Sequence, residues 1–344
     1  MSAQSTALPP TIDDTQIWDA WLSMFRLPIL NVNAEAGTFK ALSDHALTTD
    51  ELAAELQVDA RALAMHLAAL CADGYVEKRL GKWRATALAR TWLHPEGQGN
   101  WSTFLSSIDR NEHLRTRLAE SLKTGQRPGS VDERPANWEQ GTMAPETAQR
   151  IAAFMQAHSQ APALGAARLP VFGTLKHLMD VGCGSGVYGI EIARANPSLK
   201  VTLMDLKEVA HEAGKYVAAA GVGAQVATAG VNMFTQEWPT GPDGHFFSNV
   251  FHDWSEETNT DLARRSFAAL PSGGRIFLNE ILMDDDYTGP FHAAAFSLLM
   301  LTGTLGKQYS LAEFRDILGA AGFVDVQAER SGGGYYSVVS ARKK

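Results

Sequence analysis

The feature that most constrains the fold is a glycine-rich turn directly after an apolar run. Residues 177–186 read HLMDVGCGSG, with Gly182, Gly184 and Gly186 at alternate positions. An apolar run that ends in an acid and then in closely spaced glycines indicates a strand, a tight turn and the start of a helix. Because glycine has no side chain, a ligand can approach the backbone of such a turn closely. The pattern predicts a nucleoside-type cofactor bound to a doubly wound α/β sheet.

The next apolar run narrows the choice of cofactor. Residues 200–206 (KVTLMDL) place Asp205 at the tip of a second predicted strand. In a parallel sheet this carboxylate lies beside the glycine-rich turn and can accept hydrogen bonds from both hydroxyls of a ribose. The glycine spacing differs from the Gly-x-Gly-x-x-Gly of NAD sites. Asp180, ahead of the turn, suits a cationic amino-acid group better than a pyrophosphate.

The stretch DVGCGSG at 180–186 resembles the first motif of the class I S-adenosylmethionine (SAM) methyltransferases. This resemblance implies SAM as the cofactor and a Rossmann-like sheet of seven strands. Strand and helix patterns alternate from Leu178 onward, which indicates a mostly parallel sheet with right-handed crossovers. We expect the last strand to be antiparallel. The predicted strands lie near residues 177–181, 200–205, 224–228, 244–251, 274–282, 323–329 and 335–341.

Composition is that of an ordinary globular enzyme. Of 344 residues, 45% are hydrophobic and 20% charged, and this length predicts more than one domain. There is neither an apolar run long enough to span a membrane nor a secretory signal, so we expect a cytoplasmic protein without a membrane partner. The two cysteines, Cys71 and Cys183, have no Cys/His cluster around them, which disfavours a zinc site.

Residues 1–100 show the element order of a winged helix. A capping box between Thr48 and Glu51 opens one helix, and Asp59 caps a second. A short hairpin follows. The predicted helices span 13–26, 33–42, 48–56 and 59–73, and the hairpin strands span 75–79 and 83–86.

A winged helix is typical of DNA-binding regulators, but its charge here argues for another role. Residues 1–100 contain 8 Lys and Arg against 12 Asp and Glu, and the second capped helix offers only Arg61 as a cation. Phosphate binding requires the opposite balance. We therefore predict a dimerisation domain that joins two copies of the chain, with no nucleic-acid partner. A regulator remains the alternative from another functional class.

The middle of the chain is predicted to be a helical linker and acceptor-pocket region, residues 101–170, ahead of a SAM-binding catalytic domain at 171–344. Residues 143–158 form an amphipathic helix with Met155 and His158 on its apolar face. Packing between domains is one interpretation. The other is that Met155 and His158 form a wall of the pocket above the cofactor.

The stretch FFSNVFHDW at 246–254 carries the predicted chemistry. It is similar to the HDW motif of small-molecule O-methyltransferases, typified by plant caffeic acid enzymes and bacterial natural-product relatives, which share the winged-helix dimerisation region. The resemblance covers nearly the whole chain and implies methyl transfer to a hydroxyl of an aromatic or polyketide-like acceptor. It implies His252 as general base, flanked by Glu280, with Trp254 packed on the cofactor or acceptor. Imidazole has the right pKa for that task.

Two positions depart from the family pattern. In AGVNMF, Asn232 replaces the usual acid that contacts the adenine amine, and Met233 can still lie against the adenine. In GKQYS, Gln308 stands where relatives with hydroxyl acceptors often carry an acid. Because an amide can orient a neighbour but cannot share its charge, methylation of carbon or nitrogen remains an alternative, as does a protein that binds SAM without transferring its methyl group.

The helix after this domain's fifth predicted strand is expected to line the acceptor pocket, since the resembling enzymes use it so. It offers His292, Phe296 and Met300, which suit a flat aromatic acceptor but also ordinary core packing. Convergence of His252 and His292 on a metal is a further possibility that spacing does not test. We prefer acceptor binding and predict no metal.

Overall fold

The computed structural model describes residues 20, 23–58, 60–96, 101, 105, 136–138, 141–286, 290–331 and 335–344. The chain divides into two compact units, Met1–Asp109 and Arg110–Lys344. The long helix predicted to belong to the middle region lies in the second unit, as α9 (Pro145–Ala166). Within the predicted helical linker region, residues 102–104, 106–135 and 139–140 lie outside the described residues.

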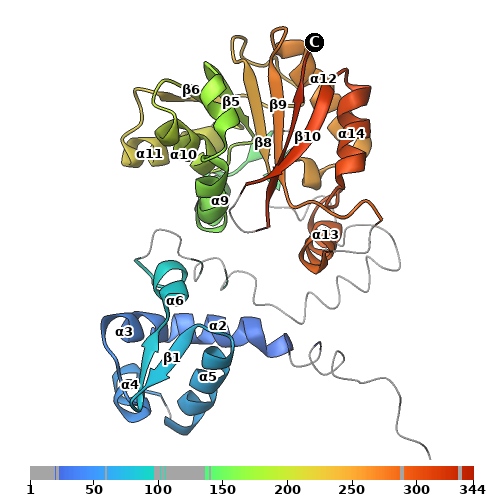
Figure 1. Ribbon diagram of the computed structural model, residues 1–344. Coiled ribbons are helices and arrows are strands. Elements are labelled where there is room, and N and C mark those ends of the chain that lie inside the picture. The colour runs from blue at the N-terminus through green and yellow to red at the C-terminus, as the bar shows by residue number, and fades with distance from the viewer. Residues whose placement is uncertain are drawn as a thin grey trace, which may run out of the picture. The chain divides into compact units, whose positions relative to one another are not determined.

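The first unit has the predicted order of two helices followed by a hairpin (Figure 1). Thr48 and Glu51 form the capping box, with the Thr48 N–H 2.7 Å from Glu51 Oε2. The strands pair antiparallel, and Trp83 is buried in the core behind them. Its elements are η1 (Ser23–Phe25), α2 (Arg26–Glu35), α3 (Thr38–Asp44), α4 (Thr49–Leu56), α5 (Ala60–Ala72), β1 (Val76–Arg79), β2 (Lys82–Ala85) and α6 (Ala87–Trp92).

The helix boundaries ahead of the capping box differ from the prediction. Gly37 adopts the left-handed conformation, with φ of 85°, and separates α2 from α3. The helix expected at 33–42 is therefore wrong: one helix ends at Glu35 and the next begins at Thr38. Asp59 and the Arg61 side chain lie outside the described part of the structure.

Within the described residues, the second unit holds a seven-stranded sheet in the order β10-β11-β9-β8-β5-β6-β7. All described neighbours pair parallel except β11, which is antiparallel to both β9 and β10. This confirms the predicted sheet with one antiparallel strand. The strands are β5 (His177–Val181), β6 (Lys200–Asp205), β7 (Val226–Gly230), β8 (Gly244–Ser248), β9 (Arg275–Glu280), β10 (Val324–Arg330) and β11 (Ser337–Arg342).

Helices cover both faces of this sheet (Figure 1). Side chains alternate along each strand: Leu178 and Phe246 enter the core shared with α9, α10 and α11, and Met179 and Phe247 enter the core shared with α12 and α14. The remaining elements are η3 (Pro170–Thr174), α10 (Val187–Ala195), α11 (Lys207–Ala220), η4 (Phe251–Asp253), α12 (Glu256–Ala269), α13 (Phe291–Gly303), α14 (Leu311–Ala320) and the short strands β3 (Ala136–Asn137) and β4 (Thr142–Met143).

The strand expected to run from 244 to 251 is shorter than predicted. Strand β8 ends at Ser248 because Asn249 takes a left-handed conformation, with φ of 54°. The chain then enters the 3-10 turn η4, which contains His252. The histidine is thereby placed beyond the carboxyl end of the strand, where ligands bind in such sheets.

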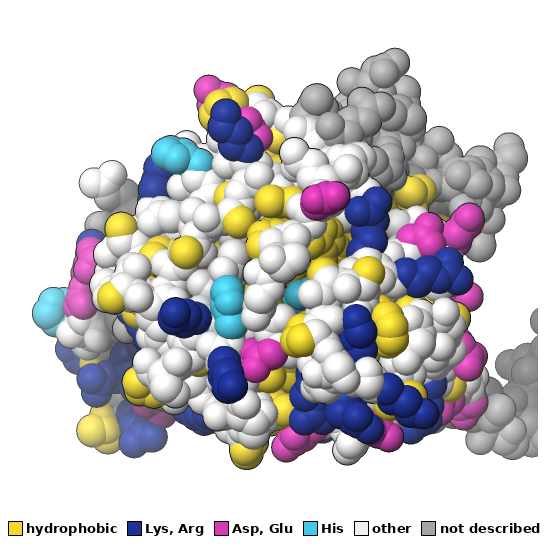
Figure 2. Space-filling model, turned by 90° about the horizontal axis from the view of Figure 1, so that it is seen from above, with side chains coloured by type: hydrophobic (Ala, Val, Ile, Leu, Met, Phe, Trp, Pro, Cys, Tyr) yellow, Lys and Arg dark blue, Asp and Glu magenta, His cyan; other side chains and the backbone are white. Residues whose placement is uncertain are grey.

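None of the helices in the described part of the chain is both long and apolar enough to cross a membrane. On the face that Figure 2 shows, Lys and Arg side chains lie among Asp, Glu and hydrophobic side chains rather than covering the face. This mixed surface agrees with the net charge of −8.

Candidate active site

The glycine-rich turn joins β5 to α10, as predicted. Its three glycines all have positive φ. A Cβ on Gly184 would lie 3.2 Å from Met155 Cγ, and one on Gly186 would lie 2.4 Å from Leu203 Cδ1. The sequence therefore needs glycine here both for the backbone conformation and for space.

Asp205 is tied to this turn by two backbone donors. The N–H of Gly184 lies 2.9 Å from Oδ2, and the N–H of Leu206 lies 2.7 Å from Oδ1. The side chain is buried, and burial raises its pKa to about 6 against the lowering effect of the two N–H groups. Each carboxylate oxygen accepts more than one hydrogen bond, so the fixed carboxylate can also accept from a ligand.

The sequence indicates a contact between Asp180 and a cationic ligand group, but the side chain lies inside the protein instead. It is fully buried, and its Oδ2 accepts a hydrogen bond of 3.1 Å from the N–H of Gly189 in the first turn of α10. Burial raises its pKa to about 7. Asp180 thus fixes the start of the helix instead of contacting a cationic ligand.

A cavity opens beside the turn and Asp205, at the carboxyl ends of β5, β6 and β8. It contains about 730 Å³ of space, part of it open to solvent, which is the size of a small-molecule cofactor site. Its lining residues come from segments far apart in sequence: Trp138, Ile151, Met155, Gly182, Gly184, Met204, Asp205, Leu206, Val231, Asn232, Met233, Phe234, Ser248, Asn249, Val250, Asp253 and Trp254.

The structure brings most of the predicted cofactor and acceptor residues to this cavity, and changes the role of some. Met155 and Trp254 lie against the cofactor cavity. Asn232 also lines it, but its Oδ1 accepts from the N–H groups of Phe234 (2.8 Å) and Thr235 (3.3 Å). Its amide oxygen therefore accepts the hydrogen bonds that cap the turn after β7, instead of one from an adenine amine.

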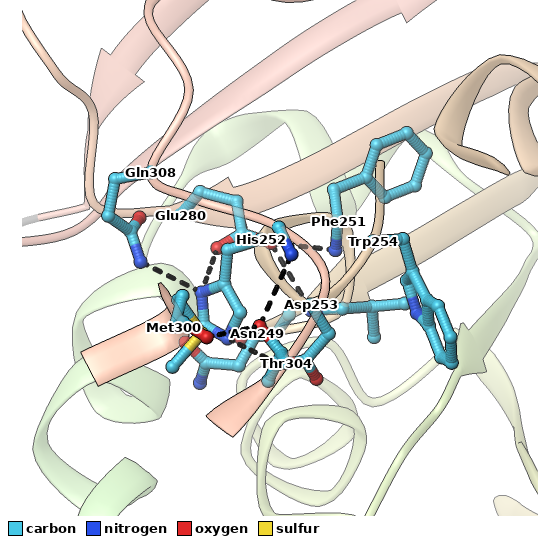
Figure 3. A network of polar contacts seen from close by, with 12 residues as sticks. Asn249, Phe251, His252, Asp253, Trp254, Glu280, Met300, Thr304 and Gln308 are labelled. Atoms are coloured by element: carbon cyan, nitrogen blue, oxygen red, sulfur yellow. Dashed lines mark hydrogen bonds and ion pairs between the residues drawn. The ribbon is translucent and has the colours of Figure 1, made fainter. Parts of the chain in front are cut away.

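His252 and Glu280 form a buried pair (Figure 3). Asp253, next to His252 in the chain, lines the cavity. His252 Nδ1 lies 2.9 Å from Glu280 Oε2, and Glu280 is fully buried. Glu280 Oε1 accepts from the N–H groups of Val250 (3.2 Å) and Phe251 (3.1 Å), which fix the carboxylate. The strand end β9 and the turn η4 thus hold the acid and the imidazole together.

The charges around His252 favour its protonated form. Burial lowers the pKa of His252, but the carboxylates of Glu280 and Asp253 outweigh that effect and raise it above its usual 6.5. Asp253 Oδ1 lies 3.7 Å from Nε2. Burial raises the pKa of Asp253 itself to about 6, against the opposing effect of His252. The imidazole is therefore equipped to accept a proton.

The loop before α14 holds the HDW turn in place, which the sequence did not predict. The N–H of Leu305 lies 3.0 Å from Asp253 O, and Tyr309 donates to Trp254 O over 2.5 Å. A Cβ on Gly306 would lie 2.2 Å from His252 O, so the two backbones touch. Gly306 in GKQYS was the only sequence signal for this contact.

A second histidine lies near His252, but it is His158 and not His292, the residue considered as a metal ligand. His158 and His252 both pack on Phe296, with ring centroids 6.3 and 5.3 Å away. His158 also stacks on Phe154 and meets the edge of Tyr336. Burial, and secondarily the charge of His252, lowers the pKa of His158 to about 4.

His292 lies elsewhere. Its ring stacks on Tyr335 at 3.8 Å and lines a separate polar hollow with Arg330. Convergence of His252 and His292 is therefore wrong, because α13 presents Phe296, and not His292, to His252. Met300, one turn after Phe296, is buried. Among the described residues, no group of three or more His, Cys, Asp or Glu side chains could hold a metal ion.

Relatives of known activity share this architecture. The chain is 32% identical to 3-hydroxy-5-methyl-1-naphthoate 3-O-methyltransferase of Streptomyces sahachiroi, covering 94% of this chain and 93% of that one. It is 27% identical to L-tyrosine C(3)-methyltransferase of Streptomyces lavendulae, covering 86% and 82%. The crystal structure of human N-acetylserotonin methyltransferase in complex with SAM superposes with a TM-score of 0.81 at 22% identity, covering 98% and 99%.

A family model fits more than half of the chain. Residues 129–324 match the model described as an O-methyltransferase domain, and this range contains every residue assigned above to the cavity and to the His252 pair. The match favours an enzyme over a DNA-binding regulator. The chain belongs to the O-methyltransferase family, whose members take their methyl group from SAM.

Proposed function

We propose that this enzyme transfers a methyl group to a hydroxyl of an aromatic small molecule, with His252 as the general base. The observation that carries the proposal is the buried pair of His252 Nδ1 and Glu280 Oε2, 2.9 Å apart. A carboxylate at Nδ1 favours a proton on that nitrogen and leaves the Nε2 lone pair to accept one. It also stabilises the imidazolium that results.

The residues present fit SAM. Asp205 is held with oxygens able to accept from ribose hydroxyls, and Gly182 and Gly184 line the same cavity beside it. Met233 and Trp254 offer apolar surfaces in the same cavity. When bound there, SAM supplies an electrophilic methyl group on a sulfonium sulfur, which leaves as a thioether when the new O–C bond forms. The protein's contribution is to align the acceptor and to take its proton.

Each side chain then has a defined task. Asp205 holds the cofactor in the turn. His252 Nε2 takes the proton of the acceptor hydroxyl, and Glu280 balances the charge that forms. Phe296 lies against His252, and His158 packs on Phe296. These two rings provide a flat wall for an aromatic ring. The naphthoate acceptor in the name of one relative agrees with a flat acceptor.

A second candidate reaction is methylation of a ring carbon next to a phenolic hydroxyl. The relative that methylates C(3) of L-tyrosine favours it, as does Gln308 in place of an acid. The same base serves both reactions, because removal of the phenolic proton activates the neighbouring carbon as well as the oxygen. Mass spectrometry and NMR of the methylated product distinguish the two.

We also propose that the first unit joins two copies of the chain and does not bind nucleic acid. Its described surface exposes several large apolar side chains, and residues 1–100 carry more acids than bases. These apolar side chains are Met24, Val32, Val58, Leu80 and Leu88. Light scattering should give a dimer at micromolar concentration, and a gel shift at low salt should give no DNA complex; a monomer, or a salt-sensitive complex, would contradict this role.

The first experiment is calorimetric binding of S-adenosylhomocysteine to the wild type, Asp205→Ala and His252→Ala. We expect binding by the wild type and His252→Ala, and loss of binding by Asp205→Ala. Labelled SAM with hydroxynaphthoates and simple phenols then tests transfer, which His252→Ala should lose. Absence of binding by the wild type would contradict the cofactor site, and full transfer by His252→Ala would contradict the base.

A further inference from the structure

Two side chains compete for one atom of the catalytic histidine. Glu280 Oε2 lies 2.9 Å and Gln308 Nε2 lies 3.0 Å from His252 Nδ1 (Figure 3). Neither Glu280 Oε2 nor Gln308 Oε1 has an aligned hydrogen bond, and both side chains are fully buried. A ring nitrogen carries either a proton or a lone pair. It cannot donate to Glu280 and accept from the Gln308 N–H at the same time.

The orientation of the Gln308 amide decides which form the ring takes. With the amide nitrogen toward the ring, Nδ1 accepts, and the proton lies on Nε2, where it blocks the removal of an acceptor proton. A half turn of the amide exchanges its nitrogen and oxygen, which occupy nearly the same space. Gln308 Oε1 and Glu280 Oε2 then both accept from the Nδ1 proton, and Nε2 is free to act as the base.

Because the Gln308 amide is neutral, it leaves less negative charge around the His252 ring than an acid at the same position would. The charged or titratable groups that face His252 are Glu280 from β9, Asp253 within η4 and His158 from α9. Gln308 comes from the loop before α14 and adds no charge. Its backbone N–H is fixed by a 3.0 Å hydrogen bond to Ser297 Oγ. Gln308 is thus held by its backbone, and its side chain offers a neutral partner where a carboxylate would stabilise the imidazolium further.

We propose that Gln308 is a positioning residue that selects the reactive form of His252 and keeps it a weaker base than an acid would, which restricts the enzyme to acidic hydroxyls. These are phenols whose ring bears a carbonyl, carboxyl or similar electron-withdrawing group. Such a hydroxyl loses its proton to a weak base, whereas an ordinary phenol needs a stronger one. The inference rests on the proposed role of His252.

The test compares Gln308→Glu and Gln308→Leu with the wild type. Gln327→Glu is the matched control, because Gln327 is exposed on β10 and the change adds the same charge away from the site. Two measurements are made: the pH profile of kcat/KM with 4-nitrophenol and with phenol, and NMR titration of the His252 ring in the complex with S-adenosylhomocysteine.

With Gln308→Glu, we expect the acid limb of the profile and the NMR titration of His252 to move up by about one to three pH units, and the preference for 4-nitrophenol over phenol to decrease. Gln308→Leu should move neither upward, but should change the ring nitrogen shifts that report the protonated nitrogen. Gln327→Glu should match the wild type.

Two results would overturn the inference: an unchanged His252 titration in Gln308→Glu, or the same upward movement in Gln308→Leu as in Gln308→Glu. Failure of the proposed function looks different. In that case the wild type methylates neither phenol, or His252→Ala remains active, and the NMR titration still decides whether Gln308 controls the ring.

Discussion

His252 is buried and His158 half-buried, and both pack on Phe296, yet their pKa values move in opposite directions. Burial, and secondarily the charge of His252, acts on His158, which packs on the aromatic rings of Phe154 and Tyr336, and its pKa decreases to about 4. Burial acts on His252 as well, but Glu280 and Asp253 reverse the result. The same kind of side chain thus favours the neutral form at His158 and the protonated form at His252.

The difference shows what makes a buried histidine a base in this enzyme. Removal from water disfavours the imidazolium at both sites. Only His252 has a carboxylate 2.9 Å away, and the backbone N–H groups of Val250 and Phe251 hold that carboxylate in position. Position in the fold supplies the carboxylate, because β9 ends beside η4.

The largest expected effect separates the two histidines directly. His252→Ala should reduce kcat by about 10²–10⁴-fold, the usual contribution of a general base, and leave the binding of S-adenosylhomocysteine unchanged. His158→Ala should reduce kcat/KM far less, because His158 takes no proton. Steady-state kinetics of the two variants test this. Equal losses in both would mean that the two imidazoles act together.

Glu280→Gln should make the environment of His252 resemble that of His158. Without the charge, the pKa of His252 should decrease, so the acid limb of the kcat/KM profile should move to lower pH, since the neutral imidazole is the active form. Activity should fall by about 10–100-fold because the ring loses its orienting partner. In the wild type the acid limb should lie above pH 6.5. A limb that does not move in Glu280→Gln would show that another group sets it.

Gly306→Ala should displace the backbone around His252 without changing any titratable side chain. The new methyl group would meet His252 O at 2.2 Å, so the loop or the HDW turn must shift. We expect a loss of about 1–3 kcal/mol in unfolding free energy and up to about a tenfold loss of activity from misplaced groups. Gly319→Ala in α14 is the control, because a Cβ there meets nothing within 4 Å. Thermal unfolding and kinetics should separate the two variants.

The sequence predicted the parts of the site that are local or that follow a family pattern. The glycine turn and Asp205 follow from spacing within two strands, and the HDW resemblance led to Glu280. The sequence also placed α9 and α13 at the acceptor pocket, but it did not decide which of their side chains meets His252, because the rotation of each helix determines whether Phe296 or His292 faces it. The left-handed Asn249, the capping by Asn232 and the meeting of Gln308 with Glu280 at one atom depend on packing that no single motif contains.

The smallest expected effect concerns stability and belongs to His158. Its pKa is about 4 in the folded protein and about 6.5 when unfolded, so the unfolded chain binds more protons between these values. The folded state therefore loses stability as pH falls from about 6.5 to about 4.

His158→Phe removes this contribution of His158 to the pH dependence of stability. Between pH 7 and pH 4.5 the variant should therefore lose less unfolding free energy than the wild type, by on the order of 1–2 kcal/mol. His245, whose pKa burial lowers to about 3, contributes equally to both proteins and cancels. Denaturant unfolding at the two pH values measures the difference, and an identical loss in both proteins would mean that His158 is protonated in the folded protein and does not favour the neutral form.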